Sequence, residues 1–131
     1  FLNDLKSRIA AAGLGDRILF PGEVPAADLP ALMRALSLVV QLPRYEGYGM
    51  VPLEGMASGV PFVGTDAGYY KAFTNAGTAG LIATPEAAAA AARSILTTGF
   101  DKMAQAARAT ACTQFSAQAE ADGIAKVYET L

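Results

Sequence analysis

The sequence contains no histidine and no tryptophan, and Cys112 is its single cysteine. Without histidine, the chain can hold no Ser-His-Asp triad, no histidine metal ligand and no imidazole for acid–base catalysis. One cysteine cannot form an internal disulfide and fits a reducing compartment. These absences exclude several enzyme classes within this chain, and the single cysteine favours a cytoplasmic location.

Charged residues are also scarce, at 17% of the chain, with ten basic against twelve acidic residues and a net charge of -2. No cluster of lysine or arginine is dense enough to hold a nucleic-acid backbone, so we expect no nucleic-acid partner. No apolar run is long enough to cross a bilayer, and the first residues lack a signal-peptide pattern. A chain of 131 residues, 53% of them hydrophobic, is the size of one domain with a core.

Short apolar runs alternate with segments of helical spacing. The runs predict strands at 17–20, 37–42, 60–64 and 79–83. The other segments predict helices at 1–14, 29–36, 50–58, 69–75, 84–96, 100–115 and 116–131. In the fifth helix we expect Thr84 as N-cap, Pro85 at the first position and Glu86 in the first turn, and Ser116 should cap the last helix. This order predicts a Rossmann-like, three-layer α/β fold with a parallel sheet and helices on both faces.

Ligands of open parallel sheets bind at the carboxyl ends of the strands, in the loops that lead into helices. Three such loops are candidates, at Pro21–Val24, Pro43–Met50 and Thr65–Gly68. Each contains glycine, which lets the backbone approach a ligand closely. The middle loop carries most of the chemistry.

The middle loop contains Gly47-Tyr48-Gly49 and leads into "MVPLEGMA". Here we expect a helix that begins near Met50 or Val51, runs to Ser58 and ends at Gly59. Its first N–H groups and the positive end of its dipole would favour a phosphate or pyrophosphate.

Two carboxylates flank this loop, with Glu46 before it and Glu54 in the expected first turn of the helix. They are better suited to accept hydrogen bonds from sugar hydroxyls than to face an anion. The alternative is local, because a glutamate near a helix start is favoured by the dipole alone and loop glycines need no ligand. The residues by themselves leave these two interpretations even. The chain has no P-loop motif, and "GYGMVP" lacks the third glycine of a dinucleotide fingerprint.

The stretch "EGYGMVPLEGMASGVP" resembles the E-x7-E motif of retaining family-4 glycosyltransferases. "GLGDRILFPGEVPAADLPALMRALSLVVQL", "GVPFVGTDAG", "AGLIATPEAAAAAARSIL" and "QFSAQAEADGIAKVYETL" are similar to family segments in the same order. The resemblance covers nearly the whole chain. It implies that residues 1–131 are part of the C-terminal, nucleotide-sugar-binding lobe of a two-lobed GT-B enzyme, without the first strand–helix unit of that lobe.

The resemblance also implies roles for individual residues. Glu46 would contact hydroxyls of the donor sugar, and Glu54 would bind the ribose hydroxyls. Backbone groups of the glycine loop and helix start would receive the pyrophosphate, and the 21–24 loop would lie beside the base. The implied donor-binding residues other than Glu46 are Gly47, Tyr48, Gly49, Met50, Val51, Glu54, Pro21, Gly22, Glu23 and Val24, with Asp66 and Gly68 lining the pocket less directly. Family members retain the anomeric configuration and generally need no metal ion.

Some features depart from the family pattern. The Arg and Lys that clamp the pyrophosphate in the family would precede Phe1, and neither Arg44 nor Lys71 stands in their place. "GYYKAF" replaces the family's "G-G-x-x-E", and its Tyr69 and Tyr70 could shape a pocket or simply pack, with packing favoured. We therefore interpret the chain as a segment of a longer enzyme that requires an N-terminal acceptor-binding lobe for activity.

The expected function is sugar transfer from a nucleoside-diphosphate sugar to a glycan or lipid-linked acceptor. The form of the motif is similar to that of mannosyltransferases of lipopolysaccharide core assembly, and such a parent enzyme could lie at the inner face of the membrane. Two alternatives remain open. One is a non-catalytic Rossmann-like binding domain, and the other is an inverting or epimerase-type GT-B relative.

Overall fold

A computed structural model of the chain describes residues 1–130. Three short parallel strands form one sheet in the order β1-β2-β3. Their bounds are Val39–Gln41 for β1, Phe62–Gly64 for β2 and Gly80–Ile82 for β3. In the register of the sheet, Phe62 lies beside Val39 on one side and Gly80 on the other. The predicted parallel α/β sheet is confirmed.

Seven α-helices, one 3-10 turn and one π-helical turn are the other regular elements of the described residues. The bounds are α1 Leu2–Ala11, η1 Gly15–Arg17, α2 Leu29–Ala35, α3 Met50–Ala57, α4 Tyr70–Phe73, α5 Ala88–Ser94, η2 Ile95–Gly99, α6 Phe100–Gln114 and α7 Ala117–Glu129. The 3-10 turn η1 follows α1, and the π-helical turn η2 joins α5 to α6. The hydroxyl of Ser116 accepts from the N–H of Ala119 at 3.1 Å, which confirms the predicted cap of α7. The predicted end of that helix at Leu131 lies outside the described residues.

Helices cover both faces of the sheet, because neighbouring strand residues point to opposite sides. Phe62 lies in a cluster with residues of α2, α3, α4 and α6. Val63, the next residue of β2, packs with Ala88 of α5 and Ile95 of η2 on the other face. This three-layer arrangement matches the predicted fold class.

One predicted strand is wrong. Residues Arg17–Phe20 form the end of η1 and an irregular segment instead of a strand. Ile18 has the extended backbone that its apolar, β-branched neighbourhood favours, with φ -120° and ψ 117°. No strand in residues 1–130 pairs with it, however, and the side chain of Leu19 is 84% exposed. A strand needs a hydrogen-bonded neighbour as well as the right residues.

The predicted start of the fifth helix is also wrong. Helix α5 begins at Ala88, and residues 85–87 form a separate turn before it. Thr84 still caps locally, since its hydroxyl accepts from the N–H of Ala87 at 3.4 Å. A hydrogen bond from its own backbone, helped by one from Thr84, lowers the pKa of Glu86. The capping residues therefore close a single turn, and the alanine run then forms the helix.

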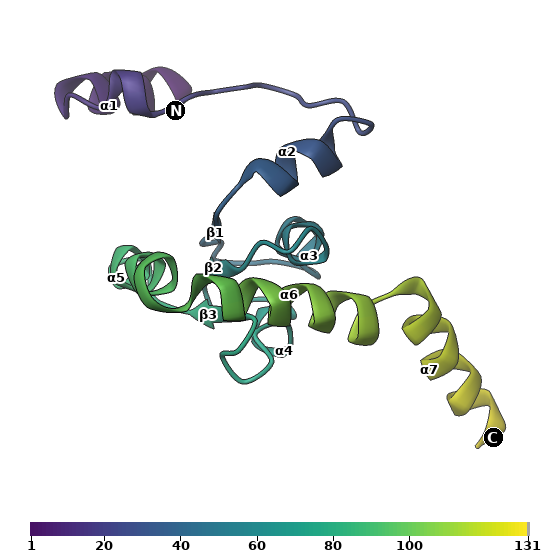
Figure 1. Cartoon of the computed structure of the whole chain (residues 1–131). Helices are drawn as coiled ribbons and strands as arrows, with labels where there is room; N and C mark the ends of the chain where they lie inside the picture. The colour runs from purple at the N-terminus through teal and green to yellow at the C-terminus, as the bar shows by residue number, and fades with distance from the viewer. Residues whose placement is uncertain (131) are drawn as a thin grey trace.

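Figure 1 shows α1 and α7 extending away from the sheet at opposite ends of the molecule, with α1 joined to α2 by an extended segment. Neither helix has a buried residue among those described. Within residues 1–130, no helix combines the length and apolar character needed to cross a membrane.

Candidate functional site

The site candidates gather at the carboxyl ends of β1 and β2, where two loops lie against each other. The hydroxyl of Thr65, after β2, donates to the carbonyl of Pro43, after β1, at 2.5 Å. The N–H of Tyr69 reaches the carbonyl of Tyr48 at 3.4 Å, and their rings pack with centroids 5.1 Å apart. Parallel strands place their ends at one edge of the sheet, so loops distant in sequence meet there.

Glu46 is the best-anchored carboxylate of this edge. Its Oε1 accepts from the N–H of Gly47 at 2.9 Å. Its Oε2 accepts from the side-chain amide of Gln41 at 3.5 Å and from the hydroxyl of Tyr70 at 3.4 Å. An ionised carboxylate has about four acceptor positions, so it retains capacity for a further donor.

The amide oxygen of Gln41 adds an unused acceptor beside this carboxylate. It is buried, and it has no hydrogen-bond partner within residues 1–130. The amide nitrogen of the same side chain donates to Glu46, so the amide oxygen does not point at that carboxylate. A buried acceptor without a donor is unusual in a native protein and is consistent with a ligand hydroxyl or a water at this position.

Helix α3 begins at Met50, as predicted, and Gly49 is its N-cap with φ 108°. This left-handed conformation favours glycine. Within residues 1–130, the N–H groups of Met50 and Val51 have no acceptor, and Pro52 has no N–H. The first N–H that is paired belongs to Leu53, which donates to the carbonyl of Gly49 at 3.3 Å. The helix start therefore presents free donors and the positive end of its dipole to the glycine loop.

Glu54 is not in the first turn of α3, which contrasts with the prediction. The helix begins at Met50, so Glu54 is its fifth residue and lies one turn further in. It lines a groove of about 530 Å³ between α2 and α3 that also contains Arg34 and Arg108 but not Glu46. Arg108 donates to the carbonyl of Ala57 at 3.1 Å. The structure therefore gives the two glutamates different surroundings.

The third loop contributes Gly68 and Asp66 in different ways. Gly68 has φ 51° and packs directly on the backbone of Glu46. Asp66 is exposed and forms an ion pair with Lys71 at 2.6 Å. Beside this loop, Thr65 and Asp66 line a cavity of about 330 Å³ with the residues that follow β3, Ala83 to Pro85 among them.

The predicted 21–24 loop is not hydrogen-bonded to the glycine loop in the part of the chain that the structure describes. Pro21, Gly22 and Glu23 are exposed, and Val24 is half-buried. Ala26, just after this loop, lines the same groove as Glu54. The end of the loop therefore lies nearer to Glu54 than the middle of the loop does.

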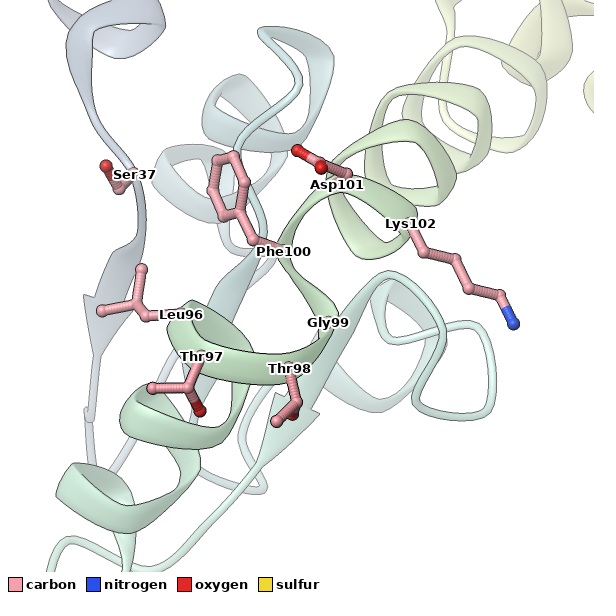
Figure 2. Close-up of a pocket in the computed structure, with 8 residues that line it drawn as sticks. All are labelled: Ser37, Leu96, Thr97, Thr98, Gly99, Phe100, Asp101 and Lys102. Carbon is pink, nitrogen blue, oxygen red and sulfur yellow. The ribbon is translucent and has the colours of Figure 1, made fainter.

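A further cavity of about 620 Å³ lies near Ser37, ahead of β1, and at the start of α6, away from the carboxyl ends of the strands. Figure 2 shows its lining, in which the Lys102 side chain extends away from the other residues. The hydroxyls of Thr97 and Thr98 donate to carbonyls of the preceding helical turn, Arg93 and Ser94, at 2.9 and 2.8 Å. Ligands of parallel sheets bind at the carboxyl ends of the strands, and this cavity lies elsewhere, so it is a poor candidate.

Sequence reasoning missed the contribution of Tyr70. The prediction that the tyrosine pair packs is correct for Tyr70, which is fully buried, while Tyr69 is about half exposed. It did not foresee that the Tyr70 hydroxyl reaches Glu46. Burial, the charge of Glu46 and this hydrogen bond raise the pKa of Tyr70 to about 12, so the phenol remains a donor at neutral pH.

Comparison with known proteins identifies the group to which this arrangement belongs. The family model described as glycosyl transferases group 1 matches residues 2–113. The chain belongs to this glycosyltransferase family. This agrees with the sequence resemblance and with the site at the carboxyl edge of the sheet.

Two curated glycosyltransferases match the whole chain. It is 41% identical to the lipopolysaccharide core biosynthesis mannosyltransferase LpsB of Rhizobium meliloti (strain 1021), and it covers 39% of that protein. It is 37% identical to the lipopolysaccharide core biosynthesis mannosyltransferase LpcC of Rhizobium leguminosarum bv. viciae, and it covers 38% of that protein. The chain thus spans under two fifths of the length of these relatives.

Solved structures confirm the fold. Anabaena Alr3699/HepE in complex with UDP is 30% identical with a TM-score of 0.84, and the match covers 100% of this chain and 37% of that one. The C-terminal domain of a glycosyl transferase group 1 protein (LpcC) from Francisella tularensis is 27% identical with a TM-score of 0.78, covering 89% of this chain and 63% of that one. The fold is therefore that of the C-terminal domain of GT-B glycosyltransferases, as predicted.

Proposed function

We propose that the protein transfers a sugar from a nucleoside-diphosphate sugar to a glycan or lipid-linked acceptor, and that this chain holds the donor. The family membership supports this proposal, and so does the match of the whole of this chain to part of two lipopolysaccharide core mannosyltransferases. The acceptor is proposed to belong to the synthesis of lipopolysaccharide or another surface polysaccharide. Transfer is proposed to retain the anomeric configuration and to need no metal ion.

One observation carries the proposal. The anchored carboxylate of Glu46 stands at the entrance of a glycine loop, and the helix after that loop presents the free N–H groups of Met50 and Val51. A sugar diphosphate carries hydroxyls at one end and negative charge in the middle. The carboxylate suits the hydroxyls, and the helix start suits the diphosphate.

The chemical task of the site is to stabilise the leaving diphosphate. As the bond between the sugar and the diphosphate breaks, negative charge increases on the oxygen that leaves with the diphosphate. Fixed N–H dipoles at the start of α3 favour that charge without having to reorient. The N–H groups of Gly49, Met50 and Val51 are the proposed donors.

The remaining residues have supporting roles in this proposal. Gly47 and Tyr48 shape the loop, and the rings of Tyr48 and Tyr69 hold it against the neighbouring one. Glu54 is proposed to accept from the ribose hydroxyls. The other proposed donor contacts are Pro21, Gly22, Glu23 and Val24 beside the base, and Asp66 and Gly68 along the pocket.

The partners of the chain follow from the same proposal. An N-terminal acceptor-binding lobe would supply the acceptor and complete the active site. A lipid-linked acceptor would bring the enzyme to the inner face of the membrane.

The test measures donor binding by the complete gene product. UDP, GDP, ADP, UDP-glucose and GDP-mannose are titrated by calorimetry, and amide NMR shifts locate the contacts. We expect binding of one base class, with shifts concentrated at residues 46–54. A protein that binds none of the five compounds contradicts the donor site.

Variants then test the individual residues. Glu46→Ala and Glu54→Ala should each lose most of the sugar transfer while the protein stays folded. Glu120→Ala, an equivalent change on the exposed surface of α7, is the matched control and should transfer normally. Normal turnover in both Glu46→Ala and Glu54→Ala would overturn the site assignment, and unaltered donor binding without any transfer would favour a binding domain.

A further inference from the structure

Tyr70 begins the short helix α4 and is fully buried, although its neighbours Tyr69 and Lys71 are exposed. A buried tyrosine normally has a hydrogen-bond partner for its hydroxyl. The partner here is Oε2 of Glu46, at 3.4 Å, on the loop of the neighbouring strand. The only hydroxyl in contact with the proposed sugar-binding carboxylate within residues 1–130 therefore comes from the helix that follows the neighbouring loop.

The Tyr70 ring packs directly against two glycines. A Cβ added to Gly64, at the end of β2, would lie 2.5 Å from Cδ2 of the ring. A Cβ added to Gly49, at the start of α3, would overlap Cε1 and lie 2.9 Å from Cδ1. Phe62 packs edge-on against the ring with centroids 5.7 Å apart. The ring is enclosed on several sides, so the position of its hydroxyl is determined by the core.

The other two donors to Glu46 are less restrictive. The N–H of Gly47 belongs to the adjacent residue and moves with the loop. The amide of Gln41, the last residue of β1, is also long at 3.5 Å, and it stands at the end of a flexible side chain, whereas the Tyr70 ring is enclosed by the core. Tyr70 is therefore the donor whose own position the core holds most firmly. Its 3.4 Å separation is long, as hydrogen bonds in ligand-free sites often are before they shorten on binding.

We propose that Tyr70 is a positioning residue that orients the Glu46 carboxylate for the donor sugar and does not itself touch the nucleotide. This inference rests on the proposed function. It predicts that removal of the tyrosine hydroxyl weakens binding of the nucleotide sugar, because only the sugar part of the donor contacts Glu46. Binding of the nucleoside diphosphate without the sugar should stay unchanged.

The test removes the hydroxyl and keeps the ring, with Tyr70→Phe in the complete gene product. Binding of UDP and UDP-glucose, and of GDP and GDP-mannose, is measured by calorimetry. We expect about tenfold weaker binding of the nucleotide sugar of the preferred base, in line with the loss of one hydrogen bond to a charged group, and unchanged binding of the free diphosphate. Tyr128→Phe removes an exposed hydroxyl on α7, and this control should bind both the diphosphate and the nucleotide sugar as the unaltered protein does.

A double-mutant cycle shows whether Tyr70 acts through Glu46. Glu46→Gln should weaken nucleotide-sugar binding, and Tyr70→Phe should add nothing further in that background. A merely structural role would weaken the diphosphate and the nucleotide sugar alike, and would add to the effect of Glu46→Gln. Thermal unfolding of each variant checks that it is folded.

The outcomes separate this inference from the proposed function. Normal nucleotide-sugar binding by Tyr70→Phe, together with a loss in Glu46→Gln, overturns the positioning role and leaves the donor site intact. Equal losses for diphosphate and nucleotide sugar also overturn it. If the unaltered protein binds none of the four compounds, the proposed function fails, and the inference fails with it.

Discussion

Gly68 packs on the backbone of Glu46. A Cβ added to Gly68 would lie 3.1 Å from the Glu46 carbonyl oxygen and 3.2 Å from Cγ of its side chain. Gly68 also has φ 51°, where a residue other than glycine is strained. The loop after β2 therefore supports the residue that bears the carboxylate on the loop after β1.

Gly68→Ala should therefore destabilise the protein and weaken donor binding at the same time. We expect a loss of about 1–2 kcal/mol in the free energy of unfolding from the left-handed backbone alone. The measurements are urea denaturation and calorimetry with UDP-glucose and GDP-mannose. Gly123→Ala in α7 is the control, because its Cβ meets nothing within 4 Å and alanine favours a helix. Unchanged stability of Gly68→Ala would show that this packing is dispensable.

Stability at alkaline pH should depend on Tyr70. Its pKa is raised from 10.0 to about 12 by burial first and by Glu46 second. The folded state thus favours the protonated phenol, and this contribution is complete below pH 10 and is lost as pH rises through about 12. The urea midpoint should fall over this window, and it should fall less in Tyr70→Phe. If the urea midpoint falls equally in the unaltered protein and in Tyr70→Phe, other titrating groups cause the loss of stability.

The same shift predicts the effect of removing the neighbouring charge. In Glu46→Gln, Tyr70 should titrate at a lower pH, since the carboxylate's charge and its hydrogen bond both raise the pKa. NMR of ring-labelled tyrosine as a function of pH measures this directly. The exposed Tyr128 on α7 provides an internal control in the same titration. If Tyr70 titrates at the same pH in both proteins, the contact with Glu46 does not persist in solution.

Gly80→Ala should cost stability because of the close approach of Phe62. A Cβ on Gly80 would lie 2.6 Å from two ring carbons of Phe62 and 2.9 Å from its carbonyl oxygen. Overpacking of this kind typically costs about 1–3 kcal/mol, and Phe62 cannot move without disturbing the ring of Tyr70. Chemical denaturation measures the change. Gly99→Ala is the matched control, because a Cβ there meets nothing within 4 Å, and a loss of equal size in both variants would contradict the steric explanation.

The ion pair of Lys71 and Asp66 should contribute little to stability. Both side chains are largely exposed, at 70% and 63%, so solvent screens their attraction. Lys71→Ala should change the free energy of unfolding by less than about 1 kcal/mol. Denaturation at low and high salt provides the check. A larger and salt-independent loss would mean that Lys71 has another structural contact.

Several elements of the fold followed from local patterns. The glycine loop was predicted, and so was a start of α3 near Met50 or Val51, because Pro52 suits a first turn, where its missing N–H costs nothing; the helix begins at Met50. Ser116 was identified as a cap for the same kind of reason. The strand at Arg17–Phe20 failed, because its residues suit a strand but none of the described strands pairs with it.

The candidate site was predictable only in part. Glu46 was named from its motif, and the structure anchors it with three donors. Glu54 was placed one turn too early in α3. The sequence left the start of the helix open between Met50 and Val51, and a shift of one residue changes the turn to which Glu54 belongs. The roles of the 21–24 loop and of Asp66 in donor binding stay predictions.

From the sequence alone came the three paired strands, the helices around them and the glycine loop, since these depend on local spacing, and the resemblance along the chain indicated the family. Only the tertiary structure decided that Tyr70 lies between Gly49 and Gly64 with its hydroxyl on Glu46. That contact joins residues 24 positions apart, one on the loop after β1 and the other at the start of α4, which follows β2. Local patterns cannot specify it, because it depends on the register of parallel strands and on how closely the rings pack in the core.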